Sequence, residues 1–346
     1  MSPDVTAVKL IRDIMKTKEG ETVAITCDSE SDWNFVLAVE SAVQSIGAKP
    51  LVLKNESPPH VGRAAEPYLP LDSLVGAVSE SDVWIELNEK WLLYSKVWEE
   101  AMKRNRTRYS CLVGMTRDMA RRCIGDVNVP KVLEFQSALQ KITEESDSMH
   151  YTTPGGTDVR FENDSSRPVI TEGNVRGPGE YMLIGQVDWA PVEETIEGVI
   201  AFDGSVNPPD ELGLLKRPVK LEVKEGRVAK IFGSPEAKIY EKWLKRLKDE
   251  NMYSLVHLSY GCNPGAKLTG HVLEDERIWG CLEWGLGNQS EGFKARNIRA
   301  ISHSDGITLR PTLTSGNGEL IIEEGNYVHP DLLGLSKALQ PSRHKA

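Results

Sequence analysis

The segment Thr22 to Thr26 (TVAIT) opens the part of the sequence that decides the fold. It is rich in β-branched residues, as a strand is, and an apolar stripe at helical spacing follows it from Asn34 to Ile46. Gly47 stands where a helix C-cap is expected, and Pro50 to Lys54 (PLVLK) has the composition of a second strand. This order predicts a βαβ unit, whose two strands lie parallel in one sheet.

The alternation of strands and helices continues through the first 148 residues. Strand-like runs recur at Val83–Leu87 and Tyr109–Val113, and helix-like stretches lie at Leu71–Ser79 and Tyr94–Arg104. Neither GxGxxG nor GxxxxGK[ST] occurs, so nucleotide binding has no support in the sequence. We therefore predict an N-terminal α/β domain with a parallel sheet over residues 1–148.

The pattern changes after residue 148, where short strands and turns prevail. Val219–Val223 and Val228–Phe232 alternate apolar and polar residues on either side of Glu225-Gly226, a pattern typical of a β-hairpin. Only Pro235–Lys248 has a strongly helical pattern here. We predict a β-rich α+β domain over residues 149–346, and hence an α/β protein of two domains.

Composition excludes several classes of partner. The formal net charge of −10 argues against nucleic acid, whose backbone requires clustered Lys and Arg, but it leaves a small substrate possible. No apolar run approaches the length of a membrane span. The five cysteines are widely spaced and form no CxxC motif, which favours reduced thiols over disulfides or a zinc ribbon. We expect a cytoplasmic homo-oligomer that binds neither nucleic acid nor membrane.

The segment Ile301 to Ile307 (ISHSDGI) contains candidate metal ligands. A strand sends residues i and i+2 to one face, so His303 and Asp305 would point together. His257, in the strand-like run Tyr253–Tyr260, could complete a facial triad of two histidines and one carboxylate. That triad holds non-haem Fe(II) with open coordination positions. The alternative is that these histidines are hydrogen-bonded structural residues.

Two further residues near this pattern have open interpretations. His271 is a rival metal ligand, fourteen residues beyond His257. Glu283 stands between Leu282 and Trp284 in a strand-like run. A carboxylate among apolar neighbours either faces the surface or lies in a cleft with a raised pKa.

Several segments of the second domain occur in the order found in one family. They are Thr152–Asp158, Gly185–Pro191, Glu197–Ser205, His257–Pro264, Leu268–Gly270 with Glu274–Glu276, and His303–Asp305. This succession resembles the thermophilic aminopeptidase (M29-type) superfamily over most of residues 150–310 and, more loosely, over the first domain. Peptidases of that family hold two metal ions. They have glutamates where this chain has Gln186 and His257, and a histidine where it has Glu283.

These departures match one branch, the 2,5-dihydroxypyridine 5,6-dioxygenases, which hold a single Fe(II). The resemblance implies that its iron ligands fall on His257, His303 and Asp305. That branch has an active-site histidine where this chain has Tyr94 and an active-site serine where it has Gly285. We expect Tyr94 and Glu283 to orient the substrate hydroxyl or to move its proton.

The resulting prediction is a mononuclear Fe(II)-dependent dioxygenase that opens a hydroxylated aromatic or N-heteroaromatic ring, with O₂ as co-substrate and the site facing the interdomain cleft. The first alternative is a hydrolase of an amide, peptide or lactam, in which the same ligands hold Zn²⁺ or Mn²⁺ and activate water. The second is a ligand-binding protein that needs no metal.

Overall fold

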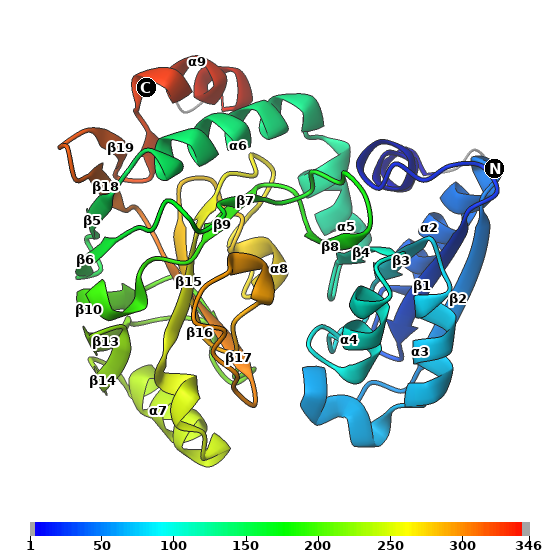
Figure 1. Ribbon diagram of the computed structural model, residues 1–346, viewed down its shortest axis with the longest axis horizontal. Helices are drawn as coiled ribbons and strands as arrows, with labels where there is room; N and C mark the ends of the chain where they lie inside the picture. The colour runs from blue at the N-terminus through cyan, green and yellow to red at the C-terminus, as the bar shows by residue number, and fades with distance from the viewer. Residues whose placement is uncertain (1–3, 341–346) are drawn as a thin grey trace. The chain divides into compact units, whose positions relative to one another are not determined.

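The computed structural model describes residues 4–340, which form two compact units (Figure 1). The first unit runs to Val127 and includes Glu172–Ile184, and the second comprises Asn128–Thr171 and the chain from Gly185 onward. The chain thus first passes from one unit to the other between Val127 and Asn128, ahead of the boundary expected between residues 148 and 149. The reason is that the intervening helix α6 (Val129–Glu144) buries its apolar side chains in the core of the second unit.

The first unit is built on a parallel sheet with strand order β2-β1-β3-β4-β8. Its strands are β1 (Thr22–Asp28), β2 (Lys49–Asn55), β3 (Val83–Glu86), β4 (Arg108–Cys111) and β8 (Gly179–Met182). Its α-helices are α1 (Val5–Val8), α2 (Trp33–Ser45), α3 (Leu71–Ser79), α4 (Lys96–Lys103) and α5 (Arg117–Ala120), with shorter or irregular turns η1 (Lys9–Ile14), η2 (Gly62–Tyr68) and η3 (Arg121–Gly125).

Local sequence explains the βαβ unit at the start of this sheet. The Asp32 side chain caps α2 by accepting hydrogen bonds from the backbone N–H groups of Asn34 and Phe35. Most of the apolar stripe of α2 is buried, although Leu37 is exposed, and β3 is buried along its whole length, as parallel strands usually are. The strand–helix–strand order predicted from Thr22 to Lys54 is present.

The second unit contains two antiparallel sheets. One has the strand order β14-β13-β10-β6-β5-β18-β19-β20, and the other has the order β12-β11-β17-β16-β15-β9-β7. The strands of the first are β5 (Ser148–Thr152), β6 (Asp158–Glu162), β10 (Glu197–Phe202), β13 (Val219–Lys224), β14 (Arg227–Phe232), β18 (Thr312–Ser315), β19 (Leu320–Glu323) and β20 (Asn326–Tyr327). Those of the second are β7 (Ile170–Thr171), β9 (Gln186–Trp189), β11 (Ser205–Asn207), β12 (Gly213–Leu214), β15 (Leu255–Gly261), β16 (Leu282–Gly287) and β17 (His303–Thr308).

Both sheets contribute side chains to one hydrophobic core. Trp189 of β9 stacks on Tyr260 of β15, with ring centroids 4.6 Å apart. The helices of this unit are α6, α7 (Pro235–Leu247), α8 (Val272–Asp275) and α9 (Pro330–Leu339), with short turns η4 (Glu193–Thr195), η5 (Glu250–Tyr253) and η6 (Glu291–Phe293). The expectation of strong helix only at Pro235–Lys248 was incomplete, because α9 is also helical and packs against α6.

The predicted fold class is confirmed, with a parallel-sheet α/β unit followed by a β-rich unit. No helix within residues 4–340 combines the length and the apolar character that crossing a membrane requires.

Candidate metal centre

Three adjacent strands position the predicted metal ligands. In the second sheet β16 lies between β15 and β17, and the middle residue Gly285 is paired with His257 on one side and with Asp305 on the other. His303 and Asp305, two residues apart on β17, point to the same face as expected. The side chains of His257, His303 and Asp305 therefore converge over the middle strand, β16.

The predicted ligands lie within reach of one ion. One donor atom from each of His257, His303 and Asp305 lies within 4.8 Å of the others. His303 Nε2 is 2.8 Å from Asp305 Oδ1, and His257 Nε2 is 3.8 Å from the same oxygen. The two imidazole rings are stacked, with centroids 5.1 Å apart. His271 precedes α8 and is not part of this group.

The absence of a side chain at position 285 makes room for one of these rings. A Cβ atom on Gly285 would lie only 2.2 Å from His257 Cε1 and 2.7 Å from its Nε2. The serine of the resembling branch could not occupy this position unless the ring moved. The imidazole of His257 therefore fills space that a side chain at 285 would otherwise take.

His303 has a second partner that fixes its orientation. Its Nδ1 is 2.7 Å from the backbone oxygen of Asn288, a contact in which the ring nitrogen donates. With Nδ1 donating to this carbonyl, the other ring nitrogen, Nε2, faces Asp305 and is the one left to bind a metal when the ring is neutral. Although burial opposes it, the neighbouring Asp305 carboxylate raises the pKa of His303.

Glu283 is fully buried beside the three predicted ligands. Its Oε2 lies 3.2 Å from His257 Nε2, whereas its Oε1 has no hydrogen-bond partner among the described residues. Burial, together with the charges of Asp305 and Glu276, raises the pKa of Glu283 well above its ordinary value. The interpretation of Glu283 as a surface-facing carboxylate is therefore wrong.

Two further carboxylates determine the charge of this cluster. Burial and the charge of Asp305 raise the pKa of Glu276 to about 7, against the influence of Arg277. Gln186 Nε2 donates to Glu276 Oε2 at 3.3 Å. Although burial opposes it, His303 lowers the pKa of Asp305. One anionic oxygen and two imidazoles make a donor set that suits a single divalent cation, and Gln186 adds no anionic donor.

The loop between β16 and β17 contributes residues that sequence reasoning missed. Phe293 stacks on His257, with ring centroids 5.4 Å apart and an interplanar angle of 23°. Asn288 supplies the carbonyl that orients His303. Neither residue belongs to a motif, and their roles depend on how the loop folds back, so no local signal identified them.

Tyr94, the other predicted substrate residue, belongs to the first unit. It precedes α4, which begins at Lys96 and therefore two residues later than expected. Its φ of +65° is unusual for an aromatic residue, and its ring lies edge-on to Trp98 at 5.5 Å. The side chain is half-buried.

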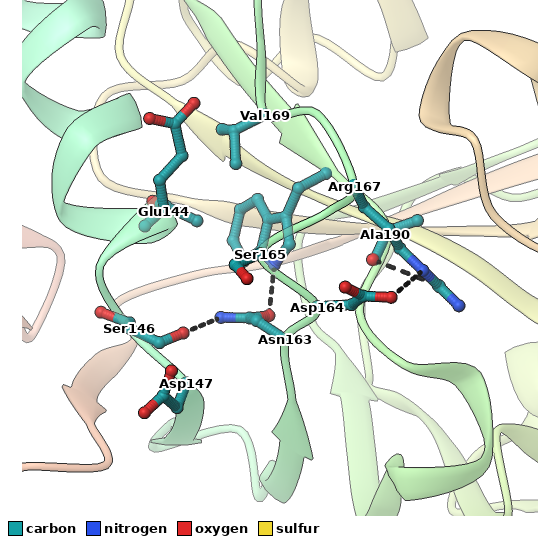
Figure 2. Close-up of a pocket in the computed structure, with 11 residues that line it drawn as sticks. Glu144, Ser146, Asp147, Asn163, Asp164, Ser165, Arg167, Val169 and Ala190 are labelled. Atoms are coloured by element: carbon teal, nitrogen blue, oxygen red, sulfur yellow. Dashed lines mark hydrogen bonds and ion pairs between the residues drawn. The ribbon is translucent and has the colours of Figure 1, made fainter.

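A separate hollow on the second unit does not contain the triad (Figure 2). Its polar groups largely bond to the protein itself. Asn163 donates to the Ser146 carbonyl at 2.8 Å and accepts from Trp189 Nε1 at 3.0 Å. Arg167 donates to the Ala190 carbonyl at 3.4 Å. These contacts support a structural role for the residues that line this hollow.

Comparison with known proteins identifies a family. A family model described as 2,5-dihydroxypyridine 5,6-dioxygenase matches residues 8–284. A curated protein of that name from Pseudomonas putida KT2440 is 24% identical over 283 residues, which cover 78% of each chain. The branch predicted from the departures at Gln186 and His257 is thereby confirmed.

Two solved structures share the fold. The structure of the 2,5-dihydroxypyridine dioxygenase from Pseudomonas putida KT2440 aligns with a TM-score of 0.76 at 19% identity, covering 95% of this chain and 98% of the other. The structure of wild-type AmpT from Thermus thermophilus aligns with a TM-score of 0.68 at 14% identity, covering 93% and 98%. At these identities the likeness concerns the fold alone.

Proposed function

This chain belongs to the 2,5-dihydroxypyridine 5,6-dioxygenase family, and we propose that it opens the ring of a hydroxypyridine-like compound at a mononuclear Fe(II) centre held by His257, His303 and Asp305. Family membership makes the chain a dioxygenase that acts on a small molecule with O₂, and it implies a metal cofactor. The identity of the metal and its ligands are our proposal. The observation that carries it is the convergence of the three donor atoms within 4.8 Å.

The donors present fit Fe(II). Two neutral imidazoles and one carboxylate on a single face are the ligand set of non-haem iron oxygenases, which leave positions open for exogenous molecules. Bound Fe(II) supplies the one-electron chemistry that dioxygen needs in order to react with an aromatic ring. The contact between His303 Nδ1 and the Asn288 carbonyl supports this assignment, because it keeps Nε2 as an acceptor for the metal.

We propose that Glu283 binds the substrate hydroxyl. Its Oε1 is buried and has no partner in the described structure, which is costly unless another molecule supplies one. The hydroxyl of a hydroxypyridine could complete this hydrogen bond and exchange its proton with the carboxyl group. Oε2 remains beside His257, so the same side chain would place the substrate ring close to the ligands.

We propose a second substrate contact from Tyr94, where the resembling branch has an active-site histidine. The left-handed backbone at Tyr94 supports this role, because such strain in a non-glycine residue is concentrated at functional sites. Its phenol can donate a hydrogen bond to a ring substituent or accept one from it.

We also propose that the protein is a cytoplasmic homo-oligomer. The five cysteines are buried thiols, which suits a reducing compartment. Exposed Trp33 and Leu37, one turn apart on α2, support a protein interface.

Anaerobic reconstitution tests the function. The protein loaded with Fe(II) is expected to consume O₂ in proportion to 2,5-dihydroxypyridine and to place both atoms of ¹⁸O₂ in the ring-opened product. Zn²⁺ is expected to give no turnover, because it has no redox chemistry. A hydrolase would instead work with Zn²⁺ or Mn²⁺, ignore oxygen and incorporate oxygen from water, and that result would overturn the proposal.

A further inference from the structure

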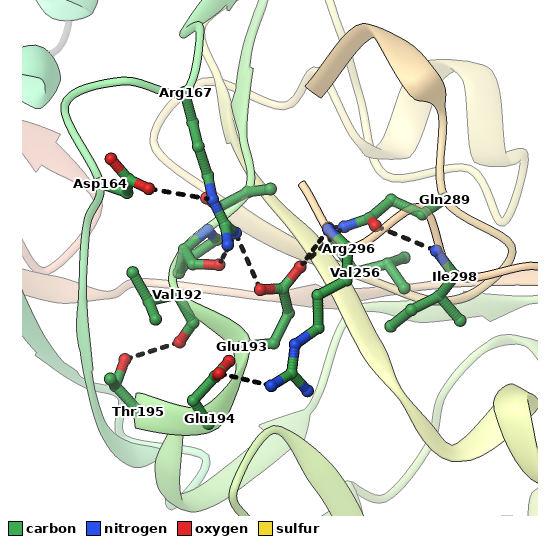
Figure 3. A network of polar contacts seen from close by, with 12 residues as sticks. Asp164, Arg167, Val192, Glu193, Glu194, Thr195, Val256, Gln289, Arg296 and Ile298 are labelled. Carbon is green, nitrogen blue, oxygen red and sulfur yellow. Dashed lines mark hydrogen bonds and ion pairs between the residues drawn. The ribbon is translucent and has the colours of Figure 1, made fainter. Parts of the chain in front are cut away.

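A buried polar network joins two loops of the second unit (Figure 3). At its centre is Glu193, on the turn η4, whose side chain is 4% exposed. Glu193 Oε2 accepts from Arg167 Nη1 at 2.9 Å, and Oε1 accepts from Gln289 Nε2 and from the backbone N–H of Arg296, each at 3.3 Å. Although burial opposes it, the backbone N–H of Glu193 itself and these three donors lower the pKa of Glu193. A buried carboxylate anion is therefore held by three partners outside its own residue.

The side chain of Gln289 connects Glu193 to β15 by hydrogen bonds. Its amide nitrogen donates both to Glu193 and to the backbone oxygen of Val256, the latter at 2.8 Å, and the residue is fully buried. Its amide oxygen accepts from the backbone N–H of Ile298 at 3.3 Å. The donors and the acceptor of this one amide thus connect the β16–β17 loop, the turn η4 and β15.

Val256, whose carbonyl accepts this hydrogen bond from Gln289, lies at an irregularity of β15. Leu255 pairs with Leu286 and His257 pairs with the next residue, Gly285, so Val256 is an extra residue on β15. Such a bulge lacks a regular ladder partner and turns the side chains beside it. The bond from Gln289 to the Val256 carbonyl therefore holds the bulge that directs the adjacent His257.

The same loop segment also holds the second histidine. Asn288, directly before Gln289, offers its carbonyl to His303 Nδ1 at 2.7 Å. The backbone of Gln289 is fixed by donation from its own N–H to the Ile298 carbonyl at 2.9 Å. The dipeptide Asn288-Gln289 thus acts on both histidines. The main-chain carbonyl of Asn288 orients His303, and the side-chain amide of Gln289 holds the bulge beside His257.

We propose that Gln289, anchored by Glu193 and Arg167, is a positioning residue that sets the geometry of both histidines of the metal centre. This inference rests on the proposed function, because it takes His257 and His303 to be metal ligands. Residues outside the ligand set that orient ligands commonly contribute 10- to 100-fold to metal affinity. Gln289 itself need not touch metal or substrate.

Binding of Co²⁺ to the apoprotein tests this inference without any activity measurement. Gln289→Met keeps the length of the side chain but removes its hydrogen bonds. We expect it to weaken Co²⁺ binding by about 10- to 100-fold and to shift the d–d absorption bands, which report the geometry of the ligands. The matched control is Gln140→Met, whose amide also donates to a backbone carbonyl, that of Val169 at 2.8 Å, away from the triad. It is expected to bind Co²⁺ as the wild type does.

The possible outcomes separate this inference from the proposed function. Wild-type affinity and spectrum in Gln289→Met would overturn the inference, and so would an equal loss in Gln140→Met, which would indicate general destabilisation. If Gln289→Met does not fold, Glu193→Gln replaces it. This change removes the charge that faces Arg167 but leaves Gln289 in place. It is expected to weaken Co²⁺ binding several-fold, and unchanged binding would overturn the inference. A wild-type protein that binds no Co²⁺, or a His303→Ala variant that binds it equally well, would instead overturn the proposed function.

Discussion

Glu86 and Glu283 are both buried carboxyl groups with raised pKa values, one in each unit of the molecule. At Glu86 one oxygen accepts from the Leu92 backbone N–H and the other accepts from the Tyr109 hydroxyl. At Glu283 one oxygen faces His257 and the other has no partner in the described structure. A raised pKa alone therefore does not mark a site. Glu283 differs from Glu86 in having a carboxylate oxygen without a hydrogen-bond partner among the described residues and in lying beside three converging candidate metal ligands.

The largest expected effect comes from removing a metal ligand. His257→Ala, His303→Ala and Asp305→Ala should each weaken metal retention by at least about 100-fold and abolish turnover, since ligands contribute more than the groups that orient them. Elemental analysis of purified protein should give close to one equivalent for the wild type and none for the variants. His271→Ala should retain its metal. Loss of the metal in His271→Ala, with retention in His257→Ala, would reverse the assignment.

The second effect tests whether Glu283 differs from Glu86 in function. Glu283→Gln should lower kcat by about 100- to 10,000-fold, the usual range for a group that moves a proton, while the metal content stays near one equivalent. Steady-state oxygen uptake and metal analysis on the same sample measure both. Glu222→Gln, which changes a strand carboxylate of the other sheet that pairs with Lys224, serves as the control. Unchanged kcat in Glu283→Gln would reduce it to a second structural carboxyl like Glu86.

The third effect concerns stability and belongs to Glu86. Burial raises the pKa of Glu86 from an ordinary value of 4.5 to about 7, although Tyr109 and Leu92 act to lower it. The folded state therefore holds a proton that the unfolded chain releases between these values. Stability should fall as the pH rises through this window and level off above it, by up to about 3 kcal/mol.

Urea unfolding at pH 5 and pH 8 checks this linkage. Glu86→Gln resembles the protonated acid and cannot titrate. Its free energy of unfolding should therefore decrease less between pH 5 and pH 8 than that of the wild type. The exposed Glu56→Gln should decline as the wild type does. If Glu86→Gln and the wild type lose equal stability between the two pH values, the carboxyl does not titrate in this range.

Local rules predicted the parts of the fold and of the site that short segments determine. The period of a strand was enough to put His303 and Asp305 on one face, and the apolar stripe of α2 was visible in the sequence. The approach of His257 depends on β16 lying between β15 and β17, a long-range pairing that no local pattern contains, and the family resemblance supplied it. The return of β8 to the parallel sheet depends on a long-range pairing of the same kind.

Other features had a signal that was not used, or had none. Helix α6 has an Asn128 cap and Pro130 in its first turn, and its apolar residues recur at helical spacing, yet it was not predicted. Gln289 had no signal, because its role exists only once a bulge in another strand presents the Val256 carbonyl. Special strand geometry near a site is therefore where sequence reasoning reaches its limit.

The smallest expected effect tests whether the unit that contains Glu86 also takes part in the chemistry. Tyr94→Phe removes only a hydroxyl, and one neutral hydrogen bond is worth ~1 kcal/mol, so kcat/KM for 2,5-dihydroxypyridine should fall about fivefold. If the phenol only binds the ring substituent, KM should rise and kcat should stay constant. If it also moves a proton, kcat should fall as well, and the pH profile should change. Metal content should not change in either case. Wild-type kcat and KM in Tyr94→Phe would confine the reaction to groups of the second unit and would leave the strained backbone at Tyr94 as a feature of the turn before α4.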